Sequence, residues 1–407
     1  MIRYLHLHLN GKIQRWIAFS LPLFISLSFT TTSSFGILPS VDALASPSPT
    51  AASSAVSATQ KVSINVLLST CVDACQRGCL EIRDVERKRQ AGEAFAVEFK
   101  DSRDPKSALT EADARAQHAI IDSLLQAWGD CLTIVGEEED EEEENILKQA
   151  LISDTSEPLR KDLCCNILKD PKVDDIVADL SDITVFVDPV DGTREFVEGR
   201  LRNCQALVGI ALKGFPVAGV IGVPFPSGVL NAEEQSTIVY GQVGVGYGTI
   251  GSKLEPQYPD QSPKRPIMAS GDATIAVMVE ARTRLIEEQF KGSNQLYGGA
   301  GNKILATALG HVDCTVQHKF GGPWDTCAPE AVLESMGGTI TDMQGKELVI
   351  TQRHTSIHWN QMGFVATGAN SVVTHEDLIQ ALKDSKVVQS YLEQGLTYLK
   401  SEATDAG

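Results

Sequence analysis

The sequence predicts a layered α/β or α+β domain, because β-rich and helical segments are mixed along most of the chain. Residues 183–187 form an unbroken run of Ile, Thr, Val and Phe, which is typical of a buried strand. Residues 206–212 and 217–223 are joined through a Lys-Gly pair and predict a hairpin. Helical patterns follow at 302–308 and 325–336, and the second stops at two glycines.

The other elements are predicted from spacing and composition. Apolar residues at helical spacing indicate a helix-rich segment at 61–100 and an amphipathic helix at 116–127. Residues 132–135 predict a short strand, and the glycine-rich stretch at 239–249 predicts another. Residues 139–182 are polar and begin inside an acidic run, so we predict a surface insertion there.

Charge and composition limit the functions that the chain can have. It has 407 residues, of which 43% are hydrophobic, and that is ample for a large core. Its 35 basic and 53 acidic residues give a formal charge of −18. Such a surface repels nucleic-acid polymers, so we expect none as a partner. A small anionic substrate fits this charge where bound divalent cations reverse its sign locally.

The nine cysteines include no CxxC pair, which argues against a zinc ribbon or a thioredoxin-type site. Cys71, Cys75 and Cys79 lie four residues apart and would line one face of a helix. They form either a metal or redox cluster or a buried face of small apolar side chains. We favour the buried face, because free cysteine packs as a small hydrophobe.

The segment from Asp188 to Phe196 carries the strongest chemical signal. It reads D-P-V-D-G-T-R-E-F and directly follows the β-rich run at 183–187. Its Pro and Gly predict a turn, on which Asp188, Asp191 and the carbonyl of Val190 can face one point. Hard divalent cations prefer such oxygen ligands. An ordinary acidic turn would explain the first five residues, but the full string is far more specific.

This string resembles the signature of the inositol monophosphatase superfamily, and three further segments agree in the family's order. They are T-x-x-D at 110–113, G-E-E at 136–138, and W-D at 324–325 upstream of the glycine pair at 337–338. Each also has a purely structural interpretation: a helix capping box, a solvated acidic face and a favourable first helical turn.

The resemblance covers about residues 61–400 and implies an αβαβα layered sandwich. It implies a metal-site subdomain at about 61–225, which carries the predicted insertion, and a substrate-contacting subdomain at about 226–400. It also implies a phosphomonoesterase with two or three Mg²⁺ ions that clamp the phosphate and activate a water molecule. No Ser or Cys nucleophile is needed, so we predict no phosphoenzyme.

Site residues are implied by the same resemblance. The metal ligands would be Glu137, Asp188, the Val190 carbonyl, Asp191 and Asp325. Asp113 and Thr193 would orient and deprotonate the attacking water, with Glu138 in a secondary role. The substrate contacts would be Gly192, Thr193, Ser270, Gly299, Lys303 and Asp325.

Two stretches resemble the 3'(2'),5'-bisphosphate nucleotidases. They are W-D-T-C-A-P-E at 324–330 and G-G-A-G-N-K at 298–303. These favour adenosine 3',5'-bisphosphate as the substrate, hydrolysed to AMP and phosphate. However, the nucleotidases' Ser-x-Ser-His segment has no His here, where residues 268–272 read Met-Ala-Ser-Gly-Asp. Inositol polyphosphate 1-phosphatase or inositol monophosphatase activity is therefore the alternative, with an inositol phosphate as substrate.

Two interpretations without catalysis are less favoured. An inactive family member that only binds metal would have no need for the complete carboxylate set and Thr193. An acidic Ca²⁺-binding protein would have to use the run at 137–144, which lacks EF-hand spacing. The sequence does not indicate an oligomeric state.

Residues 1–60 predict a leader rather than part of the fold. A basic segment without acids precedes an apolar run at 16–29, and a stretch rich in Ser, Thr, Ala and Pro follows. The first two parts are typical of a secretory signal and the third of an organelle transit peptide. We expect an organelle or secretory-pathway location, with a plastid favoured. An uncleaved Golgi or ER membrane anchor is the alternative.

Overall fold

The structure is a computed structural model that describes residues 4–6, 16–18, 60–93, 97–99, 108–138, 157–168, 175–258, 265–319, 321–348, 350 and 361–405. Contacts divide the chain into one unit, Met1–Ala58, and a second, Thr59–Gly407. Of the first, only β1 (Tyr4–His6) and β2 (Trp16–Ala18) are described, as an antiparallel pair. The rest of the predicted leader, apart from its last residue, Gln60, lies outside the described residues. Among the helices that are described, none is both long and apolar enough to cross a membrane.

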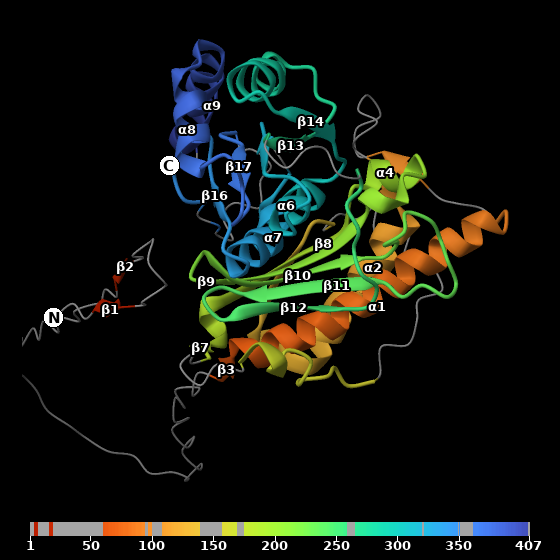
Figure 1. Ribbon diagram of the computed structural model, residues 1–407. Helices are drawn as coiled ribbons and strands as arrows, with labels where there is room; N and C mark the ends of the chain where they lie inside the picture. Colours follow the sequence, from red (N-terminus) through yellow and green to blue (C-terminus); the bar gives the residue numbers. More distant parts are fainter. Residues whose placement is uncertain are drawn as a thin grey trace, which may run out of the picture. The chain divides into compact units, whose positions relative to one another are not determined.

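A six-stranded sheet forms the centre of the second unit (Figure 1). Its strand order is β12-β11-β10-β9-β8-β6, and only β6 and β8 pair in parallel. The strands are β6 Thr133–Gly136, β8 Ile183–Asp191, β9 Gln205–Leu212, β10 Phe215–Val223, β11 Thr237–Gln242 and β12 Gly246–Ile250. The hairpin predicted at 206–223 is confirmed by β9 and β10, whereas the stretch at 239–249 makes two strands rather than one.

A second, five-stranded sheet has the order β14-β13-β15-β17-β16. It is mixed: β13 pairs in parallel with β14 and β15, and the remaining pairs are antiparallel. Its strands are β13 Ile267–Ser270, β14 Ser293–Leu296, β15 Cys314–Gln317, β16 Thr339–Thr341 and β17 Phe364–Thr367.

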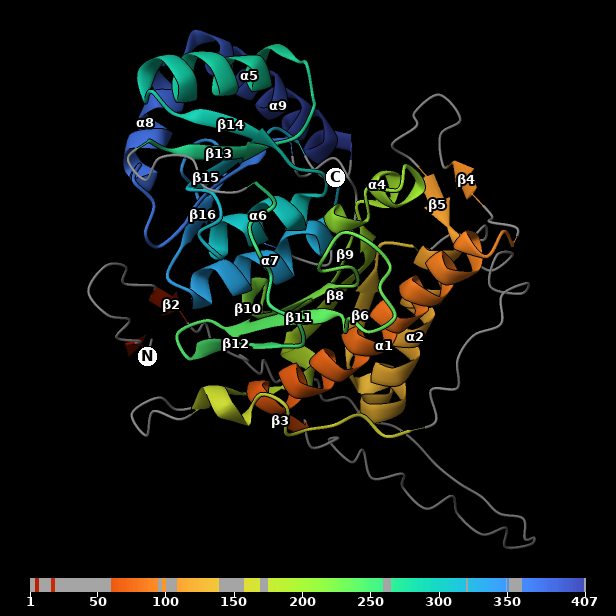
Figure 2. The same cartoon turned by 45° about the vertical axis from the view of Figure 1, so that its right-hand side comes forward.

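Helices cover both sheets and separate them, which makes five layers (Figures 1 and 2). The helices α1 and α2 pack on one face of the six-stranded sheet, and α6 and α7 lie between the two sheets. The far side of the second sheet carries α5, α8 and α9. The helices are α1 Ile64–Gln90, α2 Glu111–Trp128, α4 Thr193–Val197, α5 Ala276–Val279 with a π-helical continuation Glu280–Gln289, α6 Ala300–Ala308, α7 Pro323–Ser335, α8 His375–Asp384 and α9 Lys386–Asp405. The predicted αβαβα sandwich is confirmed.

Short elements close the edges of the unit. Two-stranded pairs form between β3 (Lys61–Ser63) and β7 (Val177–Asp179), and between β4 (Val97–Phe99) and β5 (Ala108–Thr110). Single 3₁₀ turns are Gly129–Cys131, Cys165–Leu168, Leu180–Asp182 and Leu201–Asn203.

Of the predicted surface insertion at 139–182, residues 157–168 and 175–182 are described. Leu159, Cys164 and Ile167 are buried in the main core, and β7 pairs with β3, the strand before α1. These parts of the segment therefore pack against the domain through a few apolar residues that its polar composition concealed. The acidic residues Glu139–Glu144 lie outside the described residues.

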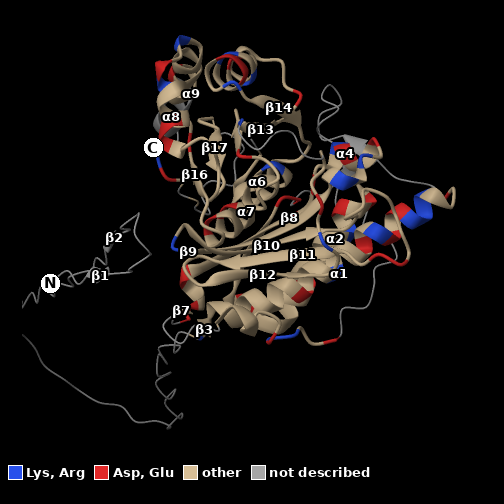
Figure 3. Ribbon diagram, in the orientation of Figure 1, with Lys and Arg blue, Asp and Glu red and all other residues tan. Residues whose placement is uncertain are grey.

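Charged residues are rare in the six-stranded sheet. In Figure 3 the strands of the six-stranded sheet are almost entirely free of charged residues, whereas the last turns of α1 carry Lys, Arg and Asp. Cys71, Cys75 and Cys79 have no exposed surface and pack in the core beneath α1 as free thiols. The interpretation of these cysteines as a buried apolar face therefore fits the structure.

Three glycines allow α7 to lie close to the six-stranded sheet. Gly219 of β10 pairs with Gly209 of β9 and with Gly241 of β11, so the three form a row across the sheet. A Cβ at Gly219 would lie 2.3 Å from the carbonyl oxygen of Ala328 in α7. The row is therefore a groove in which the helix backbone rests, and it fixes the spacing of two layers.

Gly219→Ala should lower the free energy of unfolding by about 1–3 kcal/mol, because helix and sheet must move apart. Urea unfolding measures this. Gly271→Ala is the matched control: its added Cβ would meet only the end of the Lys303 side chain, at 3.7 Å. Equal stabilities of the two variants would show that the close approach of α7 does not matter.

Candidate active site

A β-bulge near the end of β8 brings two acidic side chains to the same side of the strand. Asp188 is opposite Leu207 and Asp191 is opposite Gln205, so β8 holds one extra residue over this stretch. Residues three apart would otherwise point to opposite faces. The predicted end of the strand before Pro189 is therefore wrong, because a bulge tolerates a proline that donates no hydrogen bond.

Asp188, Asp191 and Asp325 form a carboxylate cluster. One oxygen of each lies within 4.8 Å of those of the other two, and no other group of this kind occurs in the described part of the chain. Burial, then the charges of Glu137, Asp191 and Asp325, raise the pKa of Asp188. Burial and the charge of Asp191 raise the pKa of Asp325 to about 7. The cluster thus concentrates negative charge in a buried place, which a divalent cation would stabilise.

Two helix N-termini hold this cluster in place. The carboxylate of Asp191 accepts hydrogen bonds from the backbone N–H of Ala300 (2.8 Å) and Asn302 (3.2 Å), at the start of α6. Asp325 accepts one from the N–H of Gly322 (2.7 Å), at the start of α7. The positive ends of both helix dipoles therefore stabilise carboxylates that repel one another.

Gly299 explains why the glycine-rich stretch precedes α6. Its φ is +74°, which glycine adopts readily, and a Cβ there would lie 2.5 Å from Oδ2 of Asp191. The backbone can approach the carboxylate only because this side chain is absent.

Asp113 and Thr193 meet beside the cluster. The hydroxyl of Thr193 lies 2.9 Å from Oδ1 of Asp113 and 3.0 Å from the carbonyl oxygen of Val190. The other oxygen of Asp113 accepts from the N–H (2.8 Å) and the hydroxyl (2.6 Å) of Thr110. Burial and the charge of Glu138 raise the pKa of Asp113 to about 7. One carboxylate therefore caps α2 and also reaches the site.

A cavity of about 510 Å³ opens over these groups. The predicted site residues that line it are Glu137, Asp188, Val190, Asp191, Gly192, Thr193, Gly299, Lys303 and Asp325. Lys303 is buried, and its ammonium donates to the carbonyl of Gly299 (2.5 Å). Burial lowers the pKa of Lys303, while Asp191 and Glu195 act in the opposite direction. The cavity thus joins a carboxylate floor to a buried cation.

Three predicted residues lie outside the lining of this cavity. Asp113 accepts a hydrogen bond from Thr193, which does line the cavity. Glu138 is buried, with its backbone N–H donating to Gln117 (3.2 Å). Ser270 is fully buried, and its hydroxyl donates to the side chain of Asn294 (2.8 Å). Ser270 therefore supports the second sheet at this edge, and the structure does not bring it together with the cluster.

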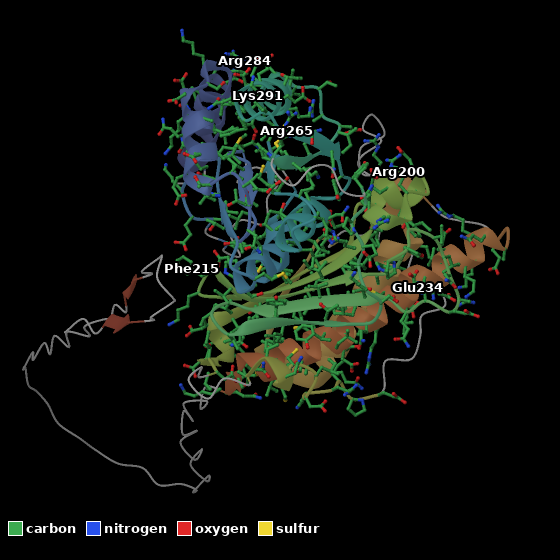
Figure 4. All side chains as sticks on the ribbon, in the orientation of Figure 1. Arg200, Phe215, Glu234, Arg265, Arg284 and Lys291 are labelled. Carbon is green, nitrogen blue, oxygen red and sulfur yellow. The ribbon has the colours of Figure 1, made fainter. Side chains whose placement is uncertain are left out.

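The sequence did not single out a polar network along one wall. Glu195 accepts two hydrogen bonds from Arg200 (2.6 and 2.7 Å) and one from Asn203 (2.8 Å). Asn203 in turn accepts from Asn302 of α6 (3.1 Å). Figure 4 labels Arg200, next to α4. In the sequence, only the position of Glu195 inside the D-P-V-D-G-T-R-E-F string could have indicated that this network belongs to the site.

Comparisons with known proteins identify the family. The model of the inositol monophosphatase family matches residues 66–385. Human 3'(2'),5'-bisphosphate nucleotidase 1 is 35% identical over 274 residues, which are 64% of this chain and 79% of the human protein. The Dictyostelium discoideum protein of the same name is 30% identical over 329 residues, 79% of this chain and 97% of that protein.

A solved structure, the inositol monophosphatase of Thermotoga maritima, is similar with a TM-score of 0.51. It is 18% identical, and the match covers 80% of this chain and 97% of that one. At this identity the similarity concerns the fold alone. The family match spans both sheets and every member of the carboxylate cluster, and the chain therefore belongs to the inositol monophosphatase family.

Proposed function

We propose that this phosphatase of the inositol monophosphatase family is a Mg²⁺-dependent 3'(2'),5'-bisphosphate nucleotidase, which hydrolyses adenosine 3',5'-bisphosphate to AMP and phosphate. The observation that carries the proposal is the buried cluster of Asp188, Asp191 and Asp325 at the floor of a cavity large enough for a nucleotide. The relatives named as nucleotidases support the choice of substrate.

The residues present fit a divalent cation. Oδ1 of Asp188 is buried without a hydrogen-bond partner among the described residues, which is costly unless something binds it. The atoms around it that could bind a metal ion are all oxygens, which Mg²⁺ prefers as ligands. Glu137, Asp188, the Val190 carbonyl, Asp191 and Asp325 would hold the ions. When bound, Mg²⁺ would neutralise phosphate charge and lower the pKa of a coordinated water molecule.

The protein's own groups would position and deprotonate that water. The Thr193 hydroxyl lies between Oδ1 of Asp113 and the Val190 carbonyl, so it can accept a hydrogen bond from water while it donates to Asp113. A proton would then pass from water through Thr193 to Asp113. A pKa of about 7 for Asp113 suits a general base near neutral pH.

The substrate's second phosphate requires a cation outside the carboxylate cluster. Lys303 lines the cavity beside Gly299 and can supply this cation as a point charge. Arg194 also lines the cavity, where it donates to Asp272 (2.8 Å) and Glu198 (2.9 Å). A bisphosphate would thus meet opposite charge at two separate places.

A phosphate-release panel with the full chain and Mg²⁺ tests the proposal. The substrates are adenosine 3',5'-bisphosphate, inositol 1-phosphate and inositol 1,4-bisphosphate, compared by kcat/KM. We expect the nucleotide to be the best substrate and AMP to be the product. A clearly higher kcat/KM on either inositol phosphate would move the chain to the inositol phosphatases. Hydrolysis of none of the three would refute phosphatase activity of this kind.

A further inference from the structure

The cavity has a second, less polar wall besides its carboxylate floor. Tyr258, Ala273, Met278 and Leu296 line it, together with the polar residues described above. Leu296 is 53% exposed, which is unusual for a leucine that ends a sheet strand. An apolar surface beside a phosphate-binding floor indicates a ligand that has an apolar part.

The topology of the second sheet builds this wall. In the parallel pair β13–β14, Ser270 is opposite Leu296, so both strands end at the same edge. The chain that leaves β13 supplies Ala273 and Met278, and the end of β14 supplies Leu296. Gly299, which contacts Asp191, follows Leu296 by three residues. Three residues span at most about 10 Å, so the wall lies within the length of one small ligand from the carboxylates.

Two contacts fix the ring of Tyr258 in this wall. Its hydroxyl donates to the carbonyl oxygen of Leu296 (2.8 Å). Its ring packs edge-on against Tyr297, with centroids 5.6 Å apart and an interplanar angle of 63°. Tyr297 is itself buried, so its ring is held in place and restricts the movement of the Tyr258 ring. The ring is therefore preorganised and loses little freedom when a ligand binds against it.

We propose that Tyr258 is a specificity-determining residue on which the base of a nucleotide substrate stacks; this inference rests on the proposed nucleotidase function. A planar base gains from an aromatic face and from the exposed Leu296 beside it. A polyol ring would instead place hydroxyl groups against a wall with few hydrogen-bond partners and lose their hydration. The wall thus selects a nucleoside bisphosphate over an inositol phosphate of similar charge.

The open position at Gly271 is consistent with this assignment. Residue 271 follows β13, and a Cβ there would meet only Lys303, at 3.7 Å or more. No side chain from this position covers the cavity, so among the lining residues only Tyr258 and Tyr297 offer large aromatic rings besides the imidazole of His318. Tyr297 is 4% exposed, which leaves Tyr258 as the ring that a base can reach.

Tyr258→Ala and Tyr258→Phe test the proposal on two substrates. One is adenosine 3',5'-bisphosphate, and the other is 1-O-methylribose 3,5-bisphosphate, which has the same phosphates and sugar without a base. The alanine variant should raise KM for the nucleotide by about 10- to 100-fold and leave KM for the baseless compound within about 2-fold. The phenylalanine variant keeps the ring and should stay within about 3-fold of wild type on both. Tyr247→Ala, at a tyrosine 56% exposed on β12, is the control and should change neither.

Calorimetric binding of AMP gives a readout that does not need turnover. Tyr258→Ala should weaken AMP binding by the same factor, whether or not the wild type hydrolyses the bisphosphate. If the wild type hydrolyses only inositol phosphates but Tyr258→Ala still weakens AMP binding, the proposed function fails, whereas the stacking of a base on Tyr258 stands. Unchanged affinity in Tyr258→Ala, an equal KM rise on both substrates, or a phenylalanine variant as weak as alanine would each overturn the stacking role.

Discussion

Asp191→Asn should lower kcat for phosphate release by about 100-fold or more while the chain stays folded. The substitution removes one of three clustered charges that would hold the cations. We expect a small change in the free energy of unfolding of the metal-free protein, because two effects of the substitution oppose each other. Asn cannot accept both backbone hydrogen bonds that start α6, but it also relieves repulsion from Asp188 and Asp325. Steady-state kinetics and thermal melting, each with and without Mg²⁺, measure both effects.

Asp313→Asn is the matched control for that variant. Asp313 also accepts backbone N–H groups on both oxygens, from Ile267 (2.7 Å) and Val372 (2.9 Å), but it does not line the cavity. It should lower stability and leave kcat near wild type. If Asp191→Asn also keeps wild-type kcat and the same rise in Tm with Mg²⁺, Asp191 is only a capping residue.

Thr193→Val should lower kcat by about 10²- to 10⁴-fold with little change in KM. Valine keeps the shape of the side chain but removes the hydroxyl between Asp113 and the Val190 carbonyl. The path for the proton from water to Asp113 is then broken, whereas the substrate still binds. Presteady-state phosphate release under saturating substrate isolates this step.

Thr315→Val controls for the loss of a buried hydroxyl. The hydroxyl of Thr315 donates to the Ala269 carbonyl (2.7 Å) inside the second sheet, away from the cavity. The variant should be less stable but fully active. A Thr193→Val enzyme that kept normal kcat would remove Thr193 from the proposed proton path.

The fold and the carboxylate cluster could be predicted because they depend on short, local strings. The run at 183–187 and the hairpin at 206–223 carry β-rich patterns that tertiary contacts reinforce. The T-x-x-D string at 110–113 fits two interpretations at once. Asp113 forms a capping box, as the structural interpretation predicts, and also reaches Thr193 as the functional one predicts. The two interpretations are not exclusive, so the sequence could not decide between them.

Other features depend on contacts between distant segments. The bulge in β8 arises from its pairing with β9, and only the partner strand reveals the extra residue. The network of Glu195, Arg200 and Asn203 is linked to α6, about 100 residues away, through Asn302. Ser270 was placed in the site by its neighbours in sequence, whereas its hydroxyl turns to Asn294 in the adjacent strand.

Removal of metal with EDTA, followed by stepwise return of Mg²⁺, tests most directly whether the carboxylate cluster works by holding cations. Phosphate release from the best substrate of the panel and the Tm of the full chain are measured at each step. We expect release to vanish in EDTA and to return with Mg²⁺, and Tm to rise as the ions bind the folded state. Full phosphate release in EDTA, with a Tm that does not respond to Mg²⁺, would contradict the account.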